Sequence, residues 1–288
     1  MSRRTLHMVG AVGLMAGVAI AAGPSALAST PHHSTASLPG IGRLIPSVTH
    51  EVLPVHGGTA TSLNWSGYAV QSAGPSSPTP SNPGDITGVT TQFTVPSAAL
   101  LPPGFAATWA GIGGYSTSDL IQAGVGENSL VTNPITGPQY YAWYELLPNS
   151  ETPLTNCSGD TSCTVTPGDK VTVNIQQVSG DTWSVSLVDA GHWTWQQNVT
   201  YSSSRSSAEW ILEAPTVGLQ TLLADVGTVH FSSDTFNVNG GTAQSISSGS
   251  PTQIVLSPGL INEATPSALG SGGQSFNDCA YAQTCPAP

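Results

Sequence analysis

The sequence predicts an all-β protein, either a sandwich or a barrel, on the basis of its composition and patterning. The chain contains 32 glycines and 23 prolines, and aromatic residues make up only 7% of it. Short alternations of apolar and polar residues recur between these turn residues, while no stretch keeps the periodicity of a long helix. Many short strands joined by glycine and proline turns are typical of sandwiches and barrels.

The first 28 residues have the features of a secretory signal. Arg3 and Arg4 precede an apolar run, and Ala26-Leu27-Ala28 forms a small-x-small cleavage site. No later apolar stretch approaches the roughly 18 residues that a membrane span requires. We therefore expect a secreted, extracellular protein with no membrane partner and with 260 residues after cleavage.

Residues 29–63 predict a leader ahead of the folded part. Four prolines interrupt this stretch, and it holds four of the seven histidines, namely His32, His33, His50 and His56. The stretch is either a prosegment that is removed or a disordered tail without a role, and the sequence leaves both interpretations open. We expect one domain over residues 64–288.

The charge balance limits the classes of partner. After loss of the signal, Arg43, Lys170 and Arg205 stand against 16 acidic residues, a formal charge of −13 near neutral pH. This charge argues against nucleic acid and anionic membranes. Protonating the carboxylates would break few ion pairs and would relieve self-repulsion, so the composition suits acidic surroundings.

The cysteines form two short-spaced pairs, Cys157 with Cys163 and Cys279 with Cys285. An even count in an exported chain predicts disulfides, and local pairing is the simplest of the three possible connectivities. A zinc site is the competing interpretation, but the spacing differs from Cys-x2-Cys and no histidine lies nearby.

The first half of the domain predicts strands separated by loops. An aromatic-rich strand opens the domain at 64–70, and the prolines of residues 72–84 predict a loop. Apolar–polar alternation and glycine turns predict further strands at 89–95, 108–114, 119–126 and 140–147. In the last of these, alternation sends Tyr141, Trp143 and Glu145 to one side, which we interpret as a cleft wall.

The second half continues as a meander and ends in a loop-rich segment. Strands are predicted at 170–177, 182–189, 192–201, 228–231 and 253–256, with turns at Gly180 and Gly191. The Gly/Ser-rich end, 245–288, is expected to be mostly loop held by its two cysteines.

Residues 207–215 place two carboxylates in an apolar run. Strand alternation puts Glu209, Ile211 and Glu213 on one face and Trp210 and Leu212 on the other. The second face should therefore pack in a core, and the first should carry two acids. Burying an unpartnered carboxylate costs several kcal/mol, so these acids either line a solvated cleft or have found donors.

Common hydrolase signatures are absent from the sequence. It contains no Gly-x-Ser-x-Gly, His-Glu-x-x-His, Asp-Thr-Gly or Asp-Ser-Gly motif, and no glycine loop followed by Lys-Ser/Thr. His192 and His230 are candidate bases, but each stands alone in a strand pattern and is expected to be a half-buried structural residue.

Five motifs resemble those of the eqolisins, the glutamic peptidases, in order and approximate spacing. They are Asn64-Trp65-Ser66-Gly67-Tyr68, Thr108-Trp109-Ala110-Gly111-Ile112-Gly113-Gly114, Leu120-Ile121-Gln122-Ala123-Gly124, Ala142-Trp143-Tyr144-Glu145 and Ala208-Glu209-Trp210-Ile211-Leu212-Glu213. The resemblance covers residues 64 to about 231 well and the C-terminal part loosely.

This resemblance implies an antiparallel β-sandwich of two large sheets, a lectin-like jelly roll with a substrate cleft on its concave face. It maps the catalytic pair to Gln122 and Glu213, and it implies that Trp109 and Glu145 line the cleft. The other expected substrate-binding residues are Trp65, Tyr141, Trp143 and Glu209. Many relatives have an acid where this chain has Gly113, so a hydrogen bond from that position is not expected here.

The implied pair suits peptide hydrolysis, which needs a base for water, an acid for the leaving amine and a donor for the oxyanion. Glu213 can take a proton and return it, and Gln122 can donate without titrating. We expect a monomer that acts on polypeptides in acid and needs no cofactor or metal.

Two alternatives remain open, a carbohydrate-binding sandwich and a glycosidase. Glu209 and Glu213 are four residues apart on one strand, roughly 13 Å, which is too far for a glycosidase pair. Glu145 from another strand could shorten that gap.

Overall fold

The structure is a computed structural model that describes residues 36–37, 43–44, 58–129, 137–217 and 219–288. The chain divides into two compact units, Met1–His32 and His33–Pro288, and all the described residues belong to the second. The predicted signal peptide and most of the predicted leader lie outside the described residues. Among the described residues, no helix has the length and apolar character needed to cross a membrane.

The described chain is all-β, as predicted. Sixteen strands form one hydrogen-bonded sheet, and two further strand pairs lie apart from it. One four-residue 3-10 helix, Ile246–Gly249, is the only helix in the described ranges. The sheet begins with the meander β12 (Trp193–Thr200), β11 (Thr182–Asp189) and β10 (Lys170–Ser179), and continues through β5 (Ile86–Thr94), β16 (Thr228–Val238), β20 (Ser275–Ala280), β19 (Ala264–Pro266) and β18 (Thr252–Leu256).

From β18 the hydrogen bonding passes to the strands that carry the sequence motifs. These are β4 (Trp65–Gln71), β13 (Ser207–Glu213), β6 (Ala107–Gly113), β7 (Leu120–Asn128), β8 (Gln139–Leu146) and β9 (Thr152–Pro153). Every pairing along this path is antiparallel. The predicted strands therefore form close to their expected positions.

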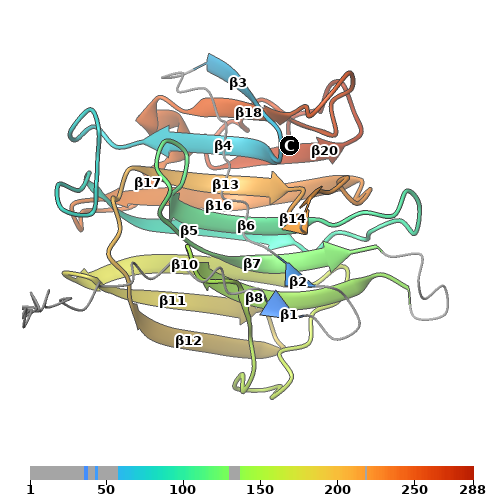
Figure 1. Ribbon diagram of the computed structural model, residues 1–288, viewed down its shortest axis with the longest axis horizontal. Helices are drawn as coiled ribbons and strands as arrows, with labels where there is room; N and C mark the ends of the chain where they lie inside the picture. The colour runs from blue at the N-terminus through green and yellow to red at the C-terminus, as the bar shows by residue number, and fades with distance from the viewer. Residues whose placement is uncertain (1–35, 38–42, 45–57, 130–136, 218) are drawn as a thin grey trace, which may run out of the picture. The chain divides into compact units, whose positions relative to one another are not determined.

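The two halves of this path face each other and enclose the main core (Figure 1). β6 and β13 both contact β5, to which neither is hydrogen-bonded. Trp210 Nε1 crosses the gap and donates to the carbonyl oxygen of Thr90 at 2.9 Å. The two layers are joined at one edge through β20, β19 and β18, so hydrogen bonding is continuous from one layer to the other.

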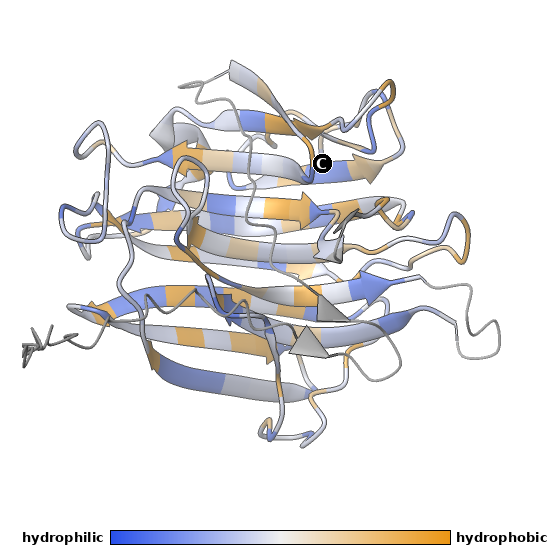
Figure 2. Ribbon diagram, in the orientation of Figure 1, coloured by the Kyte–Doolittle hydropathy of each residue, from blue (hydrophilic) through white to orange (hydrophobic). Residues whose placement is uncertain are grey.

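Every second side chain of the strands points into that core. The residues of β11 alternate regularly between buried and half-buried, and Figure 2 shows the matching change of hydropathy along β10 and β11. Trp210 and Leu212 of β13 are fully buried in the core, which confirms the predicted facing of that strand.

The C-terminal segment is more ordered than expected. The sequence analysis assigned residues 245–288 mostly to loop, yet they supply β18, β19 and β20, which join the two layers. In β20, Phe276 stacks on Phe231 at 4.5 Å and Asp278 is fully buried. The short polar pattern Ser-Phe-Asn-Asp-Cys is weak in strand propensity, so packing against β16 decides its conformation.

The ordered sheet also begins earlier than the expected boundary at Asn64. β3 (Gly58–Ser62) pairs in parallel with β18 and adds a strand in the stretch predicted as leader. A two-stranded pair, β1 (Ala36–Ser37) with β2 (Arg43–Leu44), also lies in that stretch.

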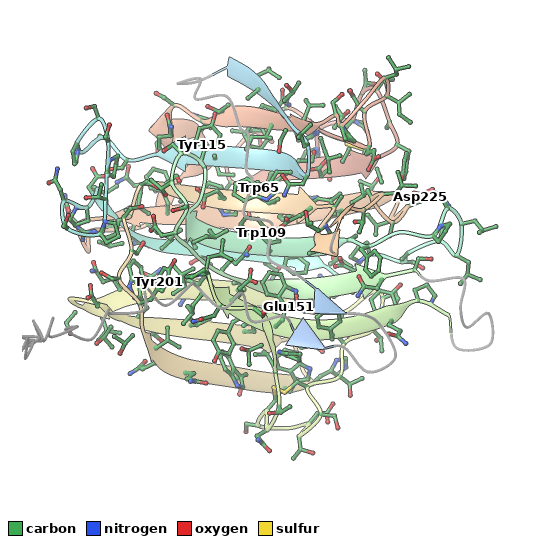
Figure 3. All side chains as sticks on the ribbon, viewed as in Figure 1. Trp65, Trp109, Tyr115, Glu151, Tyr201 and Asp225 are labelled. Carbon is green, nitrogen blue, oxygen red and sulfur yellow. A yellow bond between two sulfur atoms is a disulfide. The ribbon has the colours of Figure 1, made fainter. Side chains whose placement is uncertain are left out.

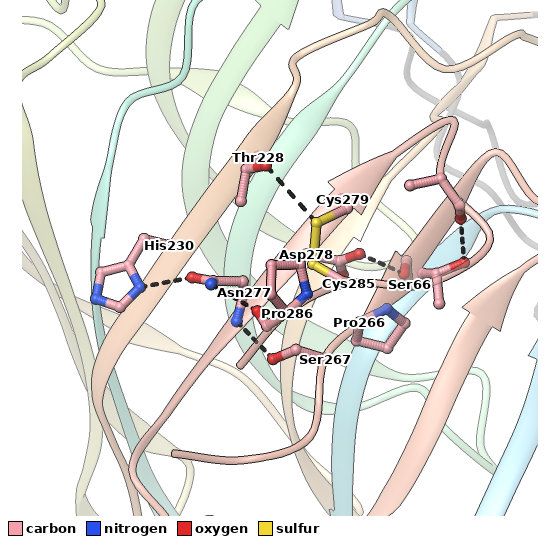
Figure 4. The surroundings of a disulfide bond; sticks show 12 residues. Ser66, Thr228, His230, Pro266, Ser267, Asn277, Asp278, Cys279, Cys285 and Pro286 are labelled. Atoms are coloured by element: carbon pink, nitrogen blue, oxygen red, sulfur yellow. Dashed lines mark hydrogen bonds between the residues drawn. A yellow bond between two sulfur atoms is a disulfide. The ribbon is translucent and has the colours of Figure 1, made fainter. Parts of the chain in front are cut away.

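Both disulfides pair locally, as predicted. Cys157 bonds to Cys163 and Cys279 to Cys285, and no free cysteine is found in the described residues. The zinc interpretation is therefore wrong. Figure 4 shows the second bridge beside Thr228 and Asp278, where it ties the C-terminus to β20.

Candidate active site

The motif strands carry a second apolar cluster on the face that points away from the main core. It includes Trp65, Trp109, Trp143 and Ile211, and Tyr141 packs against it. Trp65 and Trp109 meet edge to face with ring centroids 5.0 Å apart. Both are labelled in Figure 3, over the layer formed by β4, β13, β6, β7 and β8.

Strand register aligns the predicted site residues on this face. Ile211 of β13 lies opposite Trp109 of β6, and Trp109 lies opposite Gly124 of β7. On the next pair of strands, Gln122 lies opposite Glu145. Residues two apart on a strand share a face, so Glu213, Trp109, Gln122 and Glu145 all project to the same side.

Two glycines of β7 leave the space that the large aromatic rings of this face occupy. A Cβ atom at Gly124 would come within 2.6 Å of Trp109 Cβ, and one at Gly126 within 2.4 Å of the Tyr141 ring. Separations below about 3 Å do not occur between real side chains without displacement. The glycines of these motifs are therefore required by the aromatic rings beside them.

Glu213 is held by two donors. Trp109 Nε1 donates to its Oε2 at 2.8 Å, and Asn64 Nδ2 donates to its Oε1 at 3.0 Å. The residue is only 6% exposed, and this burial raises its pKa to about 7 although interactions with Trp109, Asn64 and Trp65 lower it. Burial and donors thus act in opposite directions on the same carboxyl group.

Gln122 is held by Glu145. Its Nε2 donates to Glu145 Oε2 at 2.5 Å, while its Oε1 is buried and finds no hydrogen-bond partner among the described residues. Burial raises the pKa of Glu145 well above its usual value, and the charges of Glu151 and Glu213 raise it further. The pKa of Glu145 therefore depends on Glu213, which the sequence analysis identified, and on Glu151, which it did not.

Glu151 is the site residue that sequence reasoning missed. It lies between β8 and β9, and burial raises its pKa to about 8, with Glu213 contributing and the Tyr141 hydroxyl opposing. No motif marks this residue, because it follows a turn of ordinary composition. Glu151 comes directly before β9, and the pairing of β9 with β8 brings it to the site.

Glu209 lies on the same face of β13 as Glu213, opposite Gly111 of β6, which in turn lies opposite Gln122 of β7. It is fully buried, and this burial raises its pKa well above normal. Hydrogen bonds from Ser207 and Tyr115 lower the pKa, and the charge of Asp119 raises it.

The two histidines are exposed, which corrects the expectation that they are half-buried. His230 Nδ1 lies 2.8 Å from Asn277 Oδ1. His192 Nδ1 lies 2.9 Å from Asp189 Oδ2 and 3.6 Å from Asp169 Oδ1. The hydrogen bond and the charge of Asp189 raise the pKa of His192, so its own positive charge balances these acids.

Among the described residues, one group has the spacing of metal ligands, and it is this group around His192. One ligand atom from each of Asp169, Asp189 and His192 lies within 4.8 Å of the others. A protonated imidazole does not bind metal, so the raised pKa of His192 opposes a cation here in acid.

Comparisons with known proteins identify the family and the fold of the chain. The model of the peptidase A4 family matches residues 63–267. A scytalido-glutamic peptidase structure with a transition state analog inhibitor is 20% identical, with a TM-score of 0.56, and the match covers 76% of this chain and 98% of that one. The same peptidase with a peptide-based transition state analog is 19% identical, with a TM-score of 0.54 and coverage of 75% and 98%.

A third solved structure is SCP-B, a member of the eqolisin family in complex with the tripeptide Ala-Ile-His. It is 20% identical, with a TM-score of 0.51, and the match covers 76% of this chain and 98% of that one. At these identities the structures show the fold alone. No curated protein sequence matches this chain. Because the family model spans well over half of its residues, the chain belongs to the peptidase A4 family, the eqolisins or glutamic peptidases.

Proposed function

We propose that this glutamic peptidase is a secreted endopeptidase in which Glu213 activates water and Gln122 stabilises the oxyanion. One observation carries the assignment of residues. Glu213, Gln122 and Glu145 project to the same face of neighbouring strands, where Trp109 donates to Glu213 and Gln122 donates to Glu145. Glu209, the other acid of its strand, is fully buried four residues before Glu213.

The proposed reaction uses each residue in one role. Ionised Glu213 takes a proton from water as the water attacks the peptide carbonyl, and it returns the proton to the leaving nitrogen. The Gln122 amide donates to the negative oxygen of the tetrahedral intermediate. Trp109 and Asn64 supply the donors that hold the Glu213 carboxylate in position.

Activity in acid depends on the pKa of Glu213. With a pKa of about 7, roughly one Glu213 in a thousand is ionised at pH 4. Burial is the largest cause of this shift, so water that enters with the substrate lowers the pKa and increases the ionised fraction. An acidic working range therefore requires that the site become hydrated when it functions.

Peptide substrates fit the aromatic face proposed here as the floor of a concave cleft. Trp65, Trp143 and Tyr141 would contact the polypeptide beside the catalytic pair. The SCP-B complex with a tripeptide supports this substrate class. The strongly acidic composition supports a protein without nucleic acid or membrane partners, and we propose that it acts as a monomer.

We also propose that the leader, residues 29 to about 63, is a prosegment removed after the signal peptide. The backbone of β2 contacts β14 (Thr216–Val217), which follows Glu213 within four residues. A leader strand beside the proposed catalytic acid would hinder substrate until it is cut. An active mature protein that keeps Ser29 as its first residue would contradict this proposal.

The test of the catalytic pair is peptide hydrolysis by folded single variants at about pH 3–5, a range near ordinary carboxylate pKa values. Glu213→Gln keeps size but cannot accept the proton, so activity should fall by about 10²–10⁴-fold. Gln122→Ala should lose about 10²–10³-fold in kcat. Glu209→Gln, the control from the same strand, should matter much less. Near wild-type turnover by Glu213→Gln would overturn the assignment.

A carbohydrate-binding role is the second candidate, favoured by one surface feature. A groove of about 520 Å³ is lined by uncharged polar residues, by Pro153 and Leu154, and by Tyr144 and Trp195, whose rings stack at 5.2 Å. Aromatic rings beside amides and hydroxyls suit neutral sugars. Incubating the protein with polysaccharides and with denatured protein distinguishes these roles, since only a peptidase releases peptides. Released sugars would indicate a glycosidase.

A further inference from the structure

Glu151 is brought opposite Glu145 by the β8–β9 hairpin. Trp143 pairs with Pro153 and Tyr144 with Thr152, and the same register continued by one residue sets Glu151 against Glu145. Residues directly opposite in an antiparallel pair have Cβ atoms about 4.5–5.5 Å apart. The hairpin therefore places two carboxyl groups side by side on the face that carries Gln122 and Glu213.

Glu145 is buried and Glu151 is half-buried. Glu145 is 6% exposed, and Oε1 of Glu151 is buried without a hydrogen-bond partner in the described part of the chain. The titratable groups that face the pair are Tyr141 on β8, Glu213 on β13 and Tyr201, which directly follows β12. Each of these groups is neutral or negative, so none of them could balance two negative charges on the pair. The pair consequently carries at most one charge until the solution is alkaline.

The state of Glu145 decides what Gln122 can do. Glu145 Oε2 accepts from Gln122 Nε2 at 2.5 Å, which leaves the second hydrogen of that amide group for a substrate oxygen. A neutral carboxyl can accept this bond through its carbonyl oxygen. An ionised carboxylate would accept it too, but it would hold a negative charge close to the place where the oxyanion forms.

We propose that Glu151 is a positioning residue that acts together with burial to keep Glu145 uncharged, so that Gln122 presents its amide NH₂ group to an oxyanion with no negative charge beside it. The inference rests on the proposed function, because it gives Gln122 the role of oxyanion donor. At about 6 Å and an effective dielectric constant of about 20, a charge on Glu145 would slow the reaction by about 10²-fold. Glu151 acts through Glu145 and does not itself touch the substrate.

The first test compares the pH dependence of kcat in the wild type and in Glu151→Gln. Without its like-charged neighbour, Glu145 ionises earlier, so the alkaline limb of kcat should move down by about one pH unit, with KM little changed. ¹³C NMR titration of the Glu145 carboxyl should show the same downward shift. Glu151→Asp, which retains the acid, should restore most of the wild-type limb. A limb that stays in place or moves up would overturn the proposal.

Glu127→Gln is the matched control. Glu127 is also fully buried and its pKa is also raised to about 8, but it alternates to the opposite face of β7 from Gln122. This change should alter stability and leave the kcat limb in place. An equal limb shift in Glu127→Gln would mean that alkaline unfolding, rather than Glu145, sets the limb, which would also overturn the proposal.

A double substitution tests whether Glu151 acts through Glu145. In a Glu145→Gln background, adding Glu151→Gln should leave the limb unmoved, whereas two independent residues would give additive shifts. Failure of the proposed function is separate, since it appears as undiminished turnover in Glu213→Gln and Gln122→Ala. Loss of activity in those two variants with a normal limb in Glu151→Gln would reject this inference alone.

Discussion

Glu213 combines two opposing influences in one carboxyl group. Both of its oxygens accept hydrogen bonds, from Asn64 and from Trp109, an arrangement that favours the ionised form. Burial favours the neutral form more strongly and raises the pKa to about 7. A carboxylate with a raised pKa is a stronger base once it is ionised, but a smaller fraction of it is ionised at a given pH.

Asn64→Ala should shift this balance in a known direction. Loss of the amide donor removes a bond to the ionised form, so the pKa of Glu213 should rise. The acid limb of kcat/KM, which reports ionisation in the free enzyme, should therefore move to higher pH. The measurement is kcat/KM against pH for wild type and variant. An acid limb shifted to lower pH would contradict the assignment of Glu213 as the base.

At the scale of the element, β6 and β7 are built around close contacts between glycines and rings. Trp109 of β6 lies beside Gly124, and this position lets its Nε1 reach Glu213 on the neighbouring strand β13. The close contact with Gly124 thus positions the Trp109 ring, and the ring positions the Glu213 carboxyl group. Glycine weakens a strand interior, so the sequence keeps it here for space rather than for strand stability.

Gly124→Ala tests this coupling. The new methyl group would lie 2.2 Å from the carbonyl oxygen of Thr108 and 2.6 Å from Trp109 Cβ, so the ring or the strand must move. We expect a loss of about 1–3 kcal/mol in the free energy of unfolding, typical of overpacking. We also expect lower kcat in the molecules that fold. Urea unfolding and kinetics measure the two effects, and Gly259→Ala, where a new methyl group would have no atom within 4 Å, serves as the matched reference. Unchanged stability and kcat would disprove the close contact.

At the scale of the whole molecule, the fold encloses several carboxyl groups away from the site. Glu127, Asp234 and Asp278 are fully buried, and in each case burial raises the pKa, to about 8 for Glu127. One carboxyl oxygen of Asp234 and one of Asp278 are buried without partners among the described residues. Such groups are stable in a fold only while they carry a proton.

Stability should therefore fall as the pH rises. A group whose pKa is higher in the folded than in the unfolded state contributes fully below its unfolded pKa, near 4, and this contribution is lost as the pH rises through the folded value, about 8 for Glu127. That group alone accounts for roughly 3–5 kcal/mol. The thermal midpoint should be higher at pH 4 than at pH 8, and Glu127→Gln should reduce the difference. A midpoint that is higher at pH 8 would refute this explanation.

The sequence by itself determined the features that depend on neighbouring residues. Alternation fixed the two faces of residues 207–213, and five-residue gaps favoured the local disulfides that form. Motif order identified the family. These signals are local because side-chain direction repeats every two residues in a strand and short loops close with little loss of entropy.

Only the tertiary structure decided which distant residues meet. β20 joins the two layers although its residues have weak strand propensity, since Phe276 packs on Phe231 from another strand. Glu151 enters the site by a hairpin register, and Glu209 is fully buried on the face that it shares with Glu213. The pKa values of these acids follow from burial and from charges on other strands, which a linear pattern does not contain.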